Sequence, residues 1–189
     1  MYKLKFFFFI NFSFLASFLY GQSINSNWEQ ELTNSIEAFK KCNQTIVNNV
    51  NPCSKYIGES VNSVYEVNDF YSEQLGRYLW GAEIIDYLKS DNQWKLLGYG
   101  YDQKALTEAQ NYANENKAVV AVYLNEEQIG HVSLILPGKL TPSGSWGFSV
   151  PNSASFFISE PQKSYVNKGL SYAFTRSMIR TVTIYGRNY

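Results

Sequence analysis

The stretch AVVAVYLNEEQIGHVSLILPG, residues 118–138, carries the pattern that decides the fold. Two apolar runs, 118–124 and 130–138, are separated by the polar turn NEEQ, and the second run ends at Pro137 and Gly138. Short apolar runs rich in valine and isoleucine and bounded by turn residues are typical of buried strands. The stretch therefore predicts two strands joined by a short turn.

Similar strand patterns continue from this pair toward the C-terminus, and helical patterns precede it. The further strands are predicted over 145–150, 153–159, 169–175 and 180–186. The helices are predicted over 28–41, from Asn51 onward, over 72–89 and over 103–116, whereas GYGYDQ, residues 98–103, is typical of a loop. Helices followed by a meandering sheet indicate the α+β class. We expect N-terminal helices packed on an antiparallel sheet of about five strands.

The first residues resemble an export signal. Lys3 and Lys5 precede an almost unbroken apolar run over 6–20, and small or polar residues follow from Gly21. This order is typical of a cleaved signal peptide, predicted over 1–21, and indicates a secreted or periplasmic protein. A retained membrane anchor is the alternative, although a span needs roughly 20 apolar residues. The remaining 22–189 has the length of one domain.

Charge and composition exclude several classes of function. The chain has 16 basic and 16 acidic residues, so loss of Lys3 and Lys5 with the signal leaves a net charge of −2. A nucleic-acid partner needs a concentrated basic face, which this balance does not predict. One histidine and two cysteines are too few for a closed zinc site, and no phosphate or dinucleotide motif occurs. We expect no metal and no cofactor.

A cysteine stands at the predicted start of the second helix. Asn51 is a favoured N-cap residue, Pro52 suits the first helical position, and Cys53 takes the second. A helix N-terminus stabilises a nearby anion, which favours the reactive thiolate. His131, the single histidine, opens the strand directly after Gly130. A thiol and an imidazole that meet between helix and sheet are what catalysis by a nucleophile and a base requires.

A third polar group usually orients the imidazole in such a site. A hairpin of 130–136 with 145–152 would pair His131 with a residue near Asn152, whose side-chain oxygen can accept a ring proton. Ser149 and Ser153 are weaker choices. A turn residue that ends a strand is an equally good interpretation of Asn152, because it follows Pro151.

Two other interpretations of the cysteines and the histidine stay open at this point. Cys42 and Cys53 are the only cysteines of a chain that we expect to be exported, where a disulfide is the usual outcome. Such a bond would leave no free thiol. His131 would then be an isolated surface histidine.

The motifs NPCSKYIGESV and AQNYANENKAVVAVYLNEEQIGHVSLILPG resemble the secreted cysteine peptidases and amidases of the NlpC and CHAP types, which cleave bacterial cell walls. The resemblance covers roughly residues 51–152 and implies a papain-like fold. It implies Cys53 as nucleophile, His131 as general base and acid, and, more loosely, Asn152 as the third residue. Tyr56 and Ile57 depart from the aromatic-rich sequence that many members carry after the cysteine.

The resemblance also implies a substrate and partners. The expected activity is cleavage of amide bonds in peptidoglycan or its peptide fragments, as an amidase or as a D-amino-acid endopeptidase. A similar chemistry occurs in antibacterial amidase effectors, whose partner is an immunity protein. The non-enzymatic alternative is a secreted wall-binding module held together by a Cys42–Cys53 disulfide.

Overall fold

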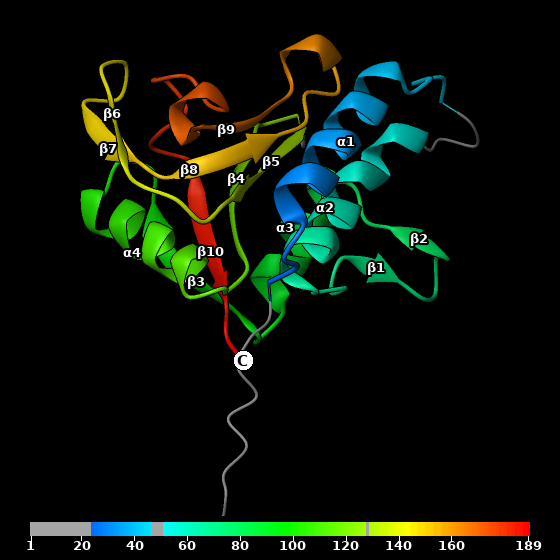
Figure 1. Ribbon diagram of the computed structural model, residues 1–189, viewed down its shortest axis with the longest axis horizontal. Coiled ribbons are helices and arrows are strands. Elements are labelled where there is room, and N and C mark those ends of the chain that lie inside the picture. The colour runs from blue at the N-terminus through cyan, green and yellow to red at the C-terminus, as the bar shows by residue number, and fades with distance from the viewer. Residues whose placement is uncertain (1–23, 47–50, 128) are drawn as a thin grey trace, which may run out of the picture.

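The computed structural model describes residues 24–46, 51–127 and 129–189 (Figure 1). The predicted signal peptide, residues 1–21, lies outside this part of the chain. Of the helices described, none is both long and apolar enough to span a membrane. The helices are α1 Trp28–Lys41, α2 Lys55–Tyr65, α3 Gly81–Ser90 and α4 Gln103–Asn114, with single 3₁₀ turns at Pro52–Ser54, Pro161–Lys163 and Leu170–Tyr172.

The main sheet has six strands in the order β3-β10-β4-β5-β8-β9, one more than the sequence predicts. All of its neighbouring strands pair antiparallel. Its strands are β3 Trp94–Tyr99, β4 Val119–Leu124, β5 Gly130–Ile135, β8 Asn152–Ser155, β9 Tyr165–Gly169 and β10 Thr183–Arg187. Two small hairpins stand apart from it, made of β1 Tyr71–Ser72 with β2 Arg77–Tyr78 and of β6 Thr141–Ser143 with β7 Phe148–Val150. The predicted α+β class is therefore confirmed.

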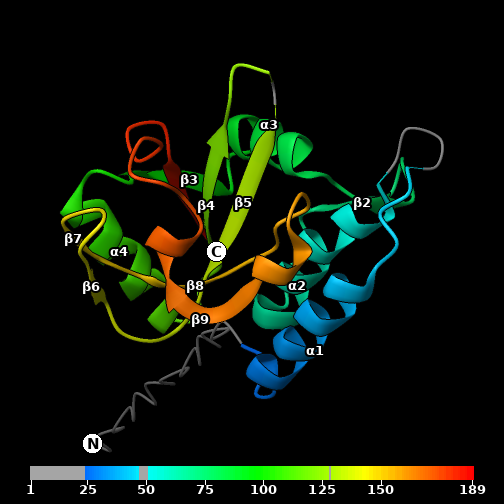
Figure 2. The same ribbon diagram turned by 90° about the horizontal axis from the view of Figure 1, so that it is seen from above.

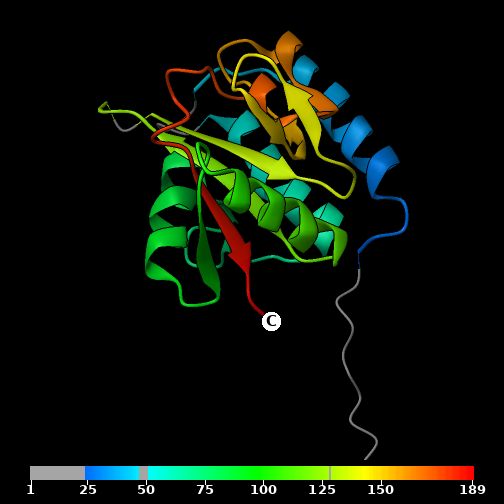
Figure 3. The same ribbon diagram turned by 90° about the vertical axis from the view of Figure 1, so that its left-hand side faces the viewer.

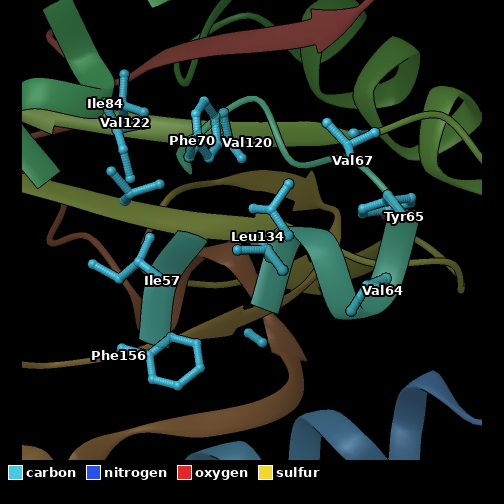
Figure 4. Close-up of a cluster of buried hydrophobic side chains, with 14 of the residues drawn as sticks. Ile57, Val64, Tyr65, Val67, Phe70, Ile84, Val120, Val122, Leu134 and Phe156 are labelled. Carbon is cyan, nitrogen blue, oxygen red and sulfur yellow. The ribbon is translucent and has the colours of Figure 1, made fainter. Parts of the chain in front are cut away.

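Helices cover both faces of this sheet. Figure 2 shows α4 on one side of β4 and β5 and α1 and α2 on the other, and in Figure 3 α4 lies nearest the viewer. The sheet has two apolar faces because successive side chains of a strand point to opposite sides. Val132 and Leu134 of β5 join the buried cluster under α1, α2 and α3, whereas Ile135 joins the cluster under α4. Figure 4 shows the first cluster, with Ile57 of α2 beside the strands.

Small residues let α4 approach the sheet closely. Ala105, Ala109 and Ala113 repeat every fourth residue of this helix and are fully buried. Gly98 of β3 has a φ of +148°, and a Cβ atom built there would lie 2.6 Å from the Cβ of Ala105. Small residues on both elements therefore allow α4 and β3 to pack closely. Strand β3 ends at Tyr99 and so includes the first two residues of the loop predicted over 98–103, and its pairing with β10 shifts register beside Gly98.

The helix predicted over 72–89 is wrong in its first half. Residues 71–78 form the β1–β2 hairpin, whose turn contains Gly76 at a φ of +61°, a conformation that ends helical structure. The helix begins only at Gly81, where Glu83 accepts a hydrogen bond from the backbone N–H of Trp80 at 2.8 Å. Arg77 holds the same carboxylate at 2.7 Å. Polar contacts thus fix the start of α3.

The strand predicted over 169–175 is also displaced. The chain pairs as β9 over Tyr165–Gly169 and then turns through a 3₁₀ segment. Leu170 still buries its side chain from this turn, and Phe174 does so from the segment just after it. Apolar residues two or four apart fit either geometry, so the pattern alone does not separate them.

Candidate functional site

A cavity of about 760 Å³ lies where β5 begins and β8 ends. Its wall is mainly apolar and aromatic, and a few polar side chains interrupt it. The polar side chains on the wall include Asn51, Ser54 and His131, together with Gln44, Tyr123, Asn125 and Ser159. The apolar wall is contributed mainly by Ile57, Trp80, Phe156, Phe157, Ile158, Phe174 and Met178. A concave apolar site with few polar groups is typical of small-molecule and peptide binding.

Cys53 stands at the start of a helical segment, as the sequence predicts. The side-chain oxygen of Asn51 accepts a hydrogen bond from the backbone N–H of Cys53 at 2.9 Å, and Pro52 takes the first helical position. The helix opens with one 3₁₀ turn and continues as α2 from Lys55. Cys53 is fully buried and does not itself line the cavity, although Ser54 beside it does.

The sulfur of Cys53 is bonded to the sulfur of Cys42, with 6.0 Å between their Cα atoms. Cys42 caps the C-terminal end of α1, so the bond joins the end of one helix to the beginning of the next. A disulfide sulfur is not a nucleophile, because that chemistry belongs to the thiolate. In this state of the protein, therefore, the assignment of Cys53 as an active nucleophile does not hold, and the disulfide interpretation of the two cysteines does.

His131 is held in an aromatic setting. Its ring stacks on Phe157 with 4.9 Å between the ring centres and meets the edge of Phe174 at 5.3 Å. Its Nε2 atom lies 2.8 Å from Oγ of Ser155, a fully buried side chain. Burial lowers the pKa of His131 to about 4, because an imidazolium loses its hydration there. The imidazole is therefore neutral at pH 7.

Cys53 and His131 lie against opposite faces of the sheet. Cys53 belongs to the buried cluster under α1, α2 and α3, together with Val132. His131 alternates with Val132 along β5, and its aromatic neighbours Phe157 and Phe174 belong to the cluster under α4. Within the described part of the chain no hydrogen bond joins the two residues. His131 shares the cavity with Asn51 and Ser54, which flank the Pro52–Cys53 pair, but not with Cys53 itself.

Asn152 does not orient His131, so this predicted contact is wrong. Strand β5 pairs with β8 in the register Ser133↔Ser155, and the carbonyl of Asn152 accepts a hydrogen bond from the N–H of Leu136, at the other end of β5. The side chain of Asn152 donates instead to the carbonyl of Pro137 at 3.0 Å. The predicted hairpin failed because the intervening β6–β7 segment forms a separate sheet.

Ser155 makes the contact with His131 that the sequence predicted for Asn152, and the sequence did not predict it. It lies on the strand next to His131 and on the same face, since Ser133 pairs with Ser155 and His131 is two residues before Ser133. The signal available was the alternation Ser153, Ala154, Ser155, Phe156, which predicts buried serines in a strand. Only the register could distinguish Ser155 from Ser153, whose hydroxyl meets Tyr165.

The site offers no obvious place for a metal ion. In residues 24–46, 51–127 and 129–189, no three histidine, cysteine, aspartate or glutamate side chains are grouped for metal binding. The polar groups on the cavity wall are amides, hydroxyls and one imidazole. No protein-family model matches the chain, and no curated protein is significantly similar to it in sequence.

Proposed function

We propose that the protein is a secreted, papain-like thiol hydrolase that cleaves amide bonds of bacterial peptidoglycan once Cys53 is reduced. One observation carries the proposal: a single cavity is lined by His131 and by Asn51 and Ser54, the residues on either side of the Pro52–Cys53 pair. The motifs around Cys53 and His131 add the resemblance to cell-wall amidases. Cys53 lies in the 3₁₀ turn that leads into α2, and His131 is the second residue of β5, and these local positions support the proposal.

The imidazole is arranged so that one nitrogen is held and the other stays available. If Nε2 donates its proton to Ser155, then Nδ1 keeps its lone pair. Ser155 therefore serves as the orienting residue in the proposal, in place of Asn152. The neutral form of His131 is the one that can accept a proton, but a pKa of about 4 makes it a weak base at pH 7, so the proposal requires a thiolate at Cys53 to raise that pKa.

The proposed reaction proceeds through a thioester. Neutral His131 first takes the proton of the Cys53 thiol, which leaves a thiolate and an imidazolium. The thiolate attacks the carbonyl carbon of the amide, a C–S bond forms, and the C–N bond breaks as the imidazolium gives that proton to the leaving amine. His131 then takes a proton from water, which hydrolyses the thioester and restores the thiol. For this to occur, the Cys53 sulfur must leave Cys42 and approach the imidazole at the shared end of the sheet.

A second candidate is a wall-binding module without catalytic activity. The observation that favours it is the Cys42–Cys53 bond itself, which occupies the proposed nucleophile. In this interpretation His131 is a buried neutral group satisfied by Ser155, and the apolar cavity only binds a ligand. The two candidates differ in whether reduced protein cuts a bond.

The deciding experiment incubates purified peptidoglycan with wild type in the presence of dithiothreitol and measures released amines and peptide fragments. We expect release from reduced wild type and its loss, by at least about 100-fold, in Cys53→Ala and His131→Ala. Lys163→Ala, a change at an exposed lysine that does not line this cavity, is the control. Binding of reduced wild type to the polymer with no fragments released from any wall type would favour the module.

A further inference from the structure

We propose that the Cys42–Cys53 disulfide is a reversible redox latch: a dithiol reductant attacks Cys42, and Cys53 departs as the free thiolate. The inference rests on the proposed role of Cys53 as a nucleophile. It adds the sulfur that is attacked, the class of the reductant and the role of Cys42, which becomes a regulatory residue with no part in the chemistry on the substrate.

The two sulfurs differ in access. Cys53 is fully buried, whereas Cys42 is partly exposed at the C-terminal end of α1, where the neighbouring Asn43 is exposed. Thiol–disulfide exchange depends on which sulfur the incoming thiolate can reach. Access therefore directs the attack to Cys42.

The two cysteines also differ in how well each would leave as a thiolate, and Cys53 is the better leaving group. Cys53 stands at the start of the helical segment that continues as α2, and Cys42 follows the last turn of α1. The positive end of a helix dipole favours a thiolate, and its negative end disfavours one. Since a more stable thiolate leaves faster, expulsion of Cys53 is favoured over expulsion of Cys42. Access and thiolate stability therefore favour the same reaction, in which Cys42 is attacked and Cys53 leaves.

The exchange balances with one dithiol. Its first thiolate forms an S–S bond to Cys42 as the Cys42–Cys53 bond breaks and Cys53 takes the electron pair. Its second thiolate then attacks the mixed disulfide and releases Cys42. Two electrons pass from the dithiol, which ends as a disulfide, to the two cysteines, and its two protons balance the two thiols formed.

Contacts other than the disulfide hold α1 against the rest of the fold. A reversible disulfide requires this, whereas a purely structural disulfide does not. Phe39 of α1 is fully buried and packs edge-on against Phe156 at 5.2 Å and Tyr56 at 5.7 Å between ring centres. Elsewhere along the helix, Glu31 accepts a hydrogen bond from Ser63 of α2 at 2.8 Å. These contacts remain when the sulfur–sulfur bond opens.

The bond also lies beside the proposed site. Gln44 and Ile46, which follow Cys42 in the chain, line the same cavity as His131. Asn51, just before the second cysteine, lines it as well. A change of redox state at Cys42 therefore takes place next to the groups that the proposed reaction uses.

The test compares Cys42→Ser with wild type before and after dithiothreitol, and uses Lys41→Ser as the matched control because it changes an exposed neighbour and keeps the bond. Two rates are measured, alkylation of Cys53 by iodoacetamide and release of fragments from peptidoglycan. Untreated wild type and Lys41→Ser should be at least about 100-fold slower in both than Cys42→Ser or reduced wild type. In Cys53→Ser, the disulfide form of a monothiol should exchange with the Cys42 thiol, leaving a stable mixed disulfide at Cys42 and releasing one equivalent of the monothiol.

Failure of the latch and failure of the proposed function give different results. Fast alkylation of Cys53 in Cys42→Ser and reduced wild type, with no fragments released, keeps the latch and rejects the hydrolase. Equal alkylation rates with and without reductant overturn the latch. So does loss of the near-ultraviolet circular dichroism signal on reduction, because the bond is then needed for the fold.

Discussion

The hydroxyl oxygen of Ser155 lies 2.8 Å from Nε2 of His131, and both residues stand on one face of the sheet at the neighbouring ends of β5 and β8. This contact fixes the plane of the imidazole and leaves its other nitrogen for the cavity. Asn152, at the far end of the same strand pair, is bound to Pro137 and Asn167 instead. We therefore expect substitution of Ser155 to lower the rate of hydrolysis much more than substitution of Asn152.

Ser155→Ala should lower the rate of wall hydrolysis by reduced protein at least about tenfold, because an imidazole that is no longer oriented transfers protons less well. Asn152→Ala should leave that rate within about twofold and cost about 1 kcal/mol of stability through its lost hydrogen bonds. The rate of peptidoglycan hydrolysis measures the effect on activity, and unfolding in urea measures the effect on stability. Equal losses of activity in the two variants would contradict the role given to Ser155.

The stability of the oxidised protein should fall as the pH is lowered from 7 to 5. The folded-state pKa of His131, about 4, lies below the ordinary value of 6.5, so the unfolded chain binds a proton in this range and the folded chain does not. The free energy of unfolding should decrease by about 2 kcal/mol over this range. His131→Gln cannot titrate and should show a flatter dependence in urea unfolding at each pH. A slope as steep as that of wild type would show that the effect arises elsewhere.

Reduction should raise the pKa of His131. In the oxidised protein only burial acts on the imidazole and lowers its pKa, but a thiolate at Cys53 would favour the charged form. Because the chain contains one histidine, its ring carbon signal in an NMR titration needs no assignment. Cys53→Ser, in which no thiolate forms, is the control and should keep the low value. The wall-binding module predicts the same low pKa in both redox states.

Removing the disulfide should weaken the fold without abolishing it. A closed loop of this length contributes about 3 kcal/mol by restricting the unfolded chain, so Cys42→Ser should lower the melting temperature by roughly 10 °C. The unfolding transition should stay cooperative because Phe39 keeps α1 in place. Calorimetry should give the melting temperature and the width of the transition for Cys42→Ser, with Lys41→Ser, which keeps the disulfide, as the control. A broad transition without a cooperative heat peak would identify the bond as a structural staple.

Gln110 should be among the most sensitive polar residues of α4. Its buried amide donates to the carbonyl of Leu136 at 2.9 Å and accepts from the N–H of Asn152 at 2.8 Å, so it holds β5 and β8 together. Gln110→Ala leaves both backbone groups without these bonds and should cost about 2–4 kcal/mol. Asn111→Ala, on the exposed side of the same helix, should cost less than about 1 kcal/mol. If chemical denaturation gave similar losses of stability for the two variants, the hydrogen bonds of Gln110 to Leu136 and Asn152 would contribute little.

Local chemistry in the sequence was enough to predict the elements whose causes lie within a few residues. The cap formed by Asn51, the position of Cys53 and the apolar strands on either side of NEEQ all follow from such chemistry, and the structure confirms them. The hairpin of residues 71–78 was missed because Gly76 and the Arg77–Glu83 contact outweigh a helical pattern there.

Which side chains meet depends on the packing of the whole chain. The separate β6–β7 hairpin shifts the partner of β5 along the chain, and the register then brings Ser155, and not Asn152, to His131. Strand alternation places His131 and Cys53 on opposite faces, and the packing of α1 against α2 brings Cys42 to Cys53. Which residues can do chemistry follows from local sequence, because that depends on residue type and local backbone. Their pairing depends on strand register and helix packing, which are set by burial across the whole chain.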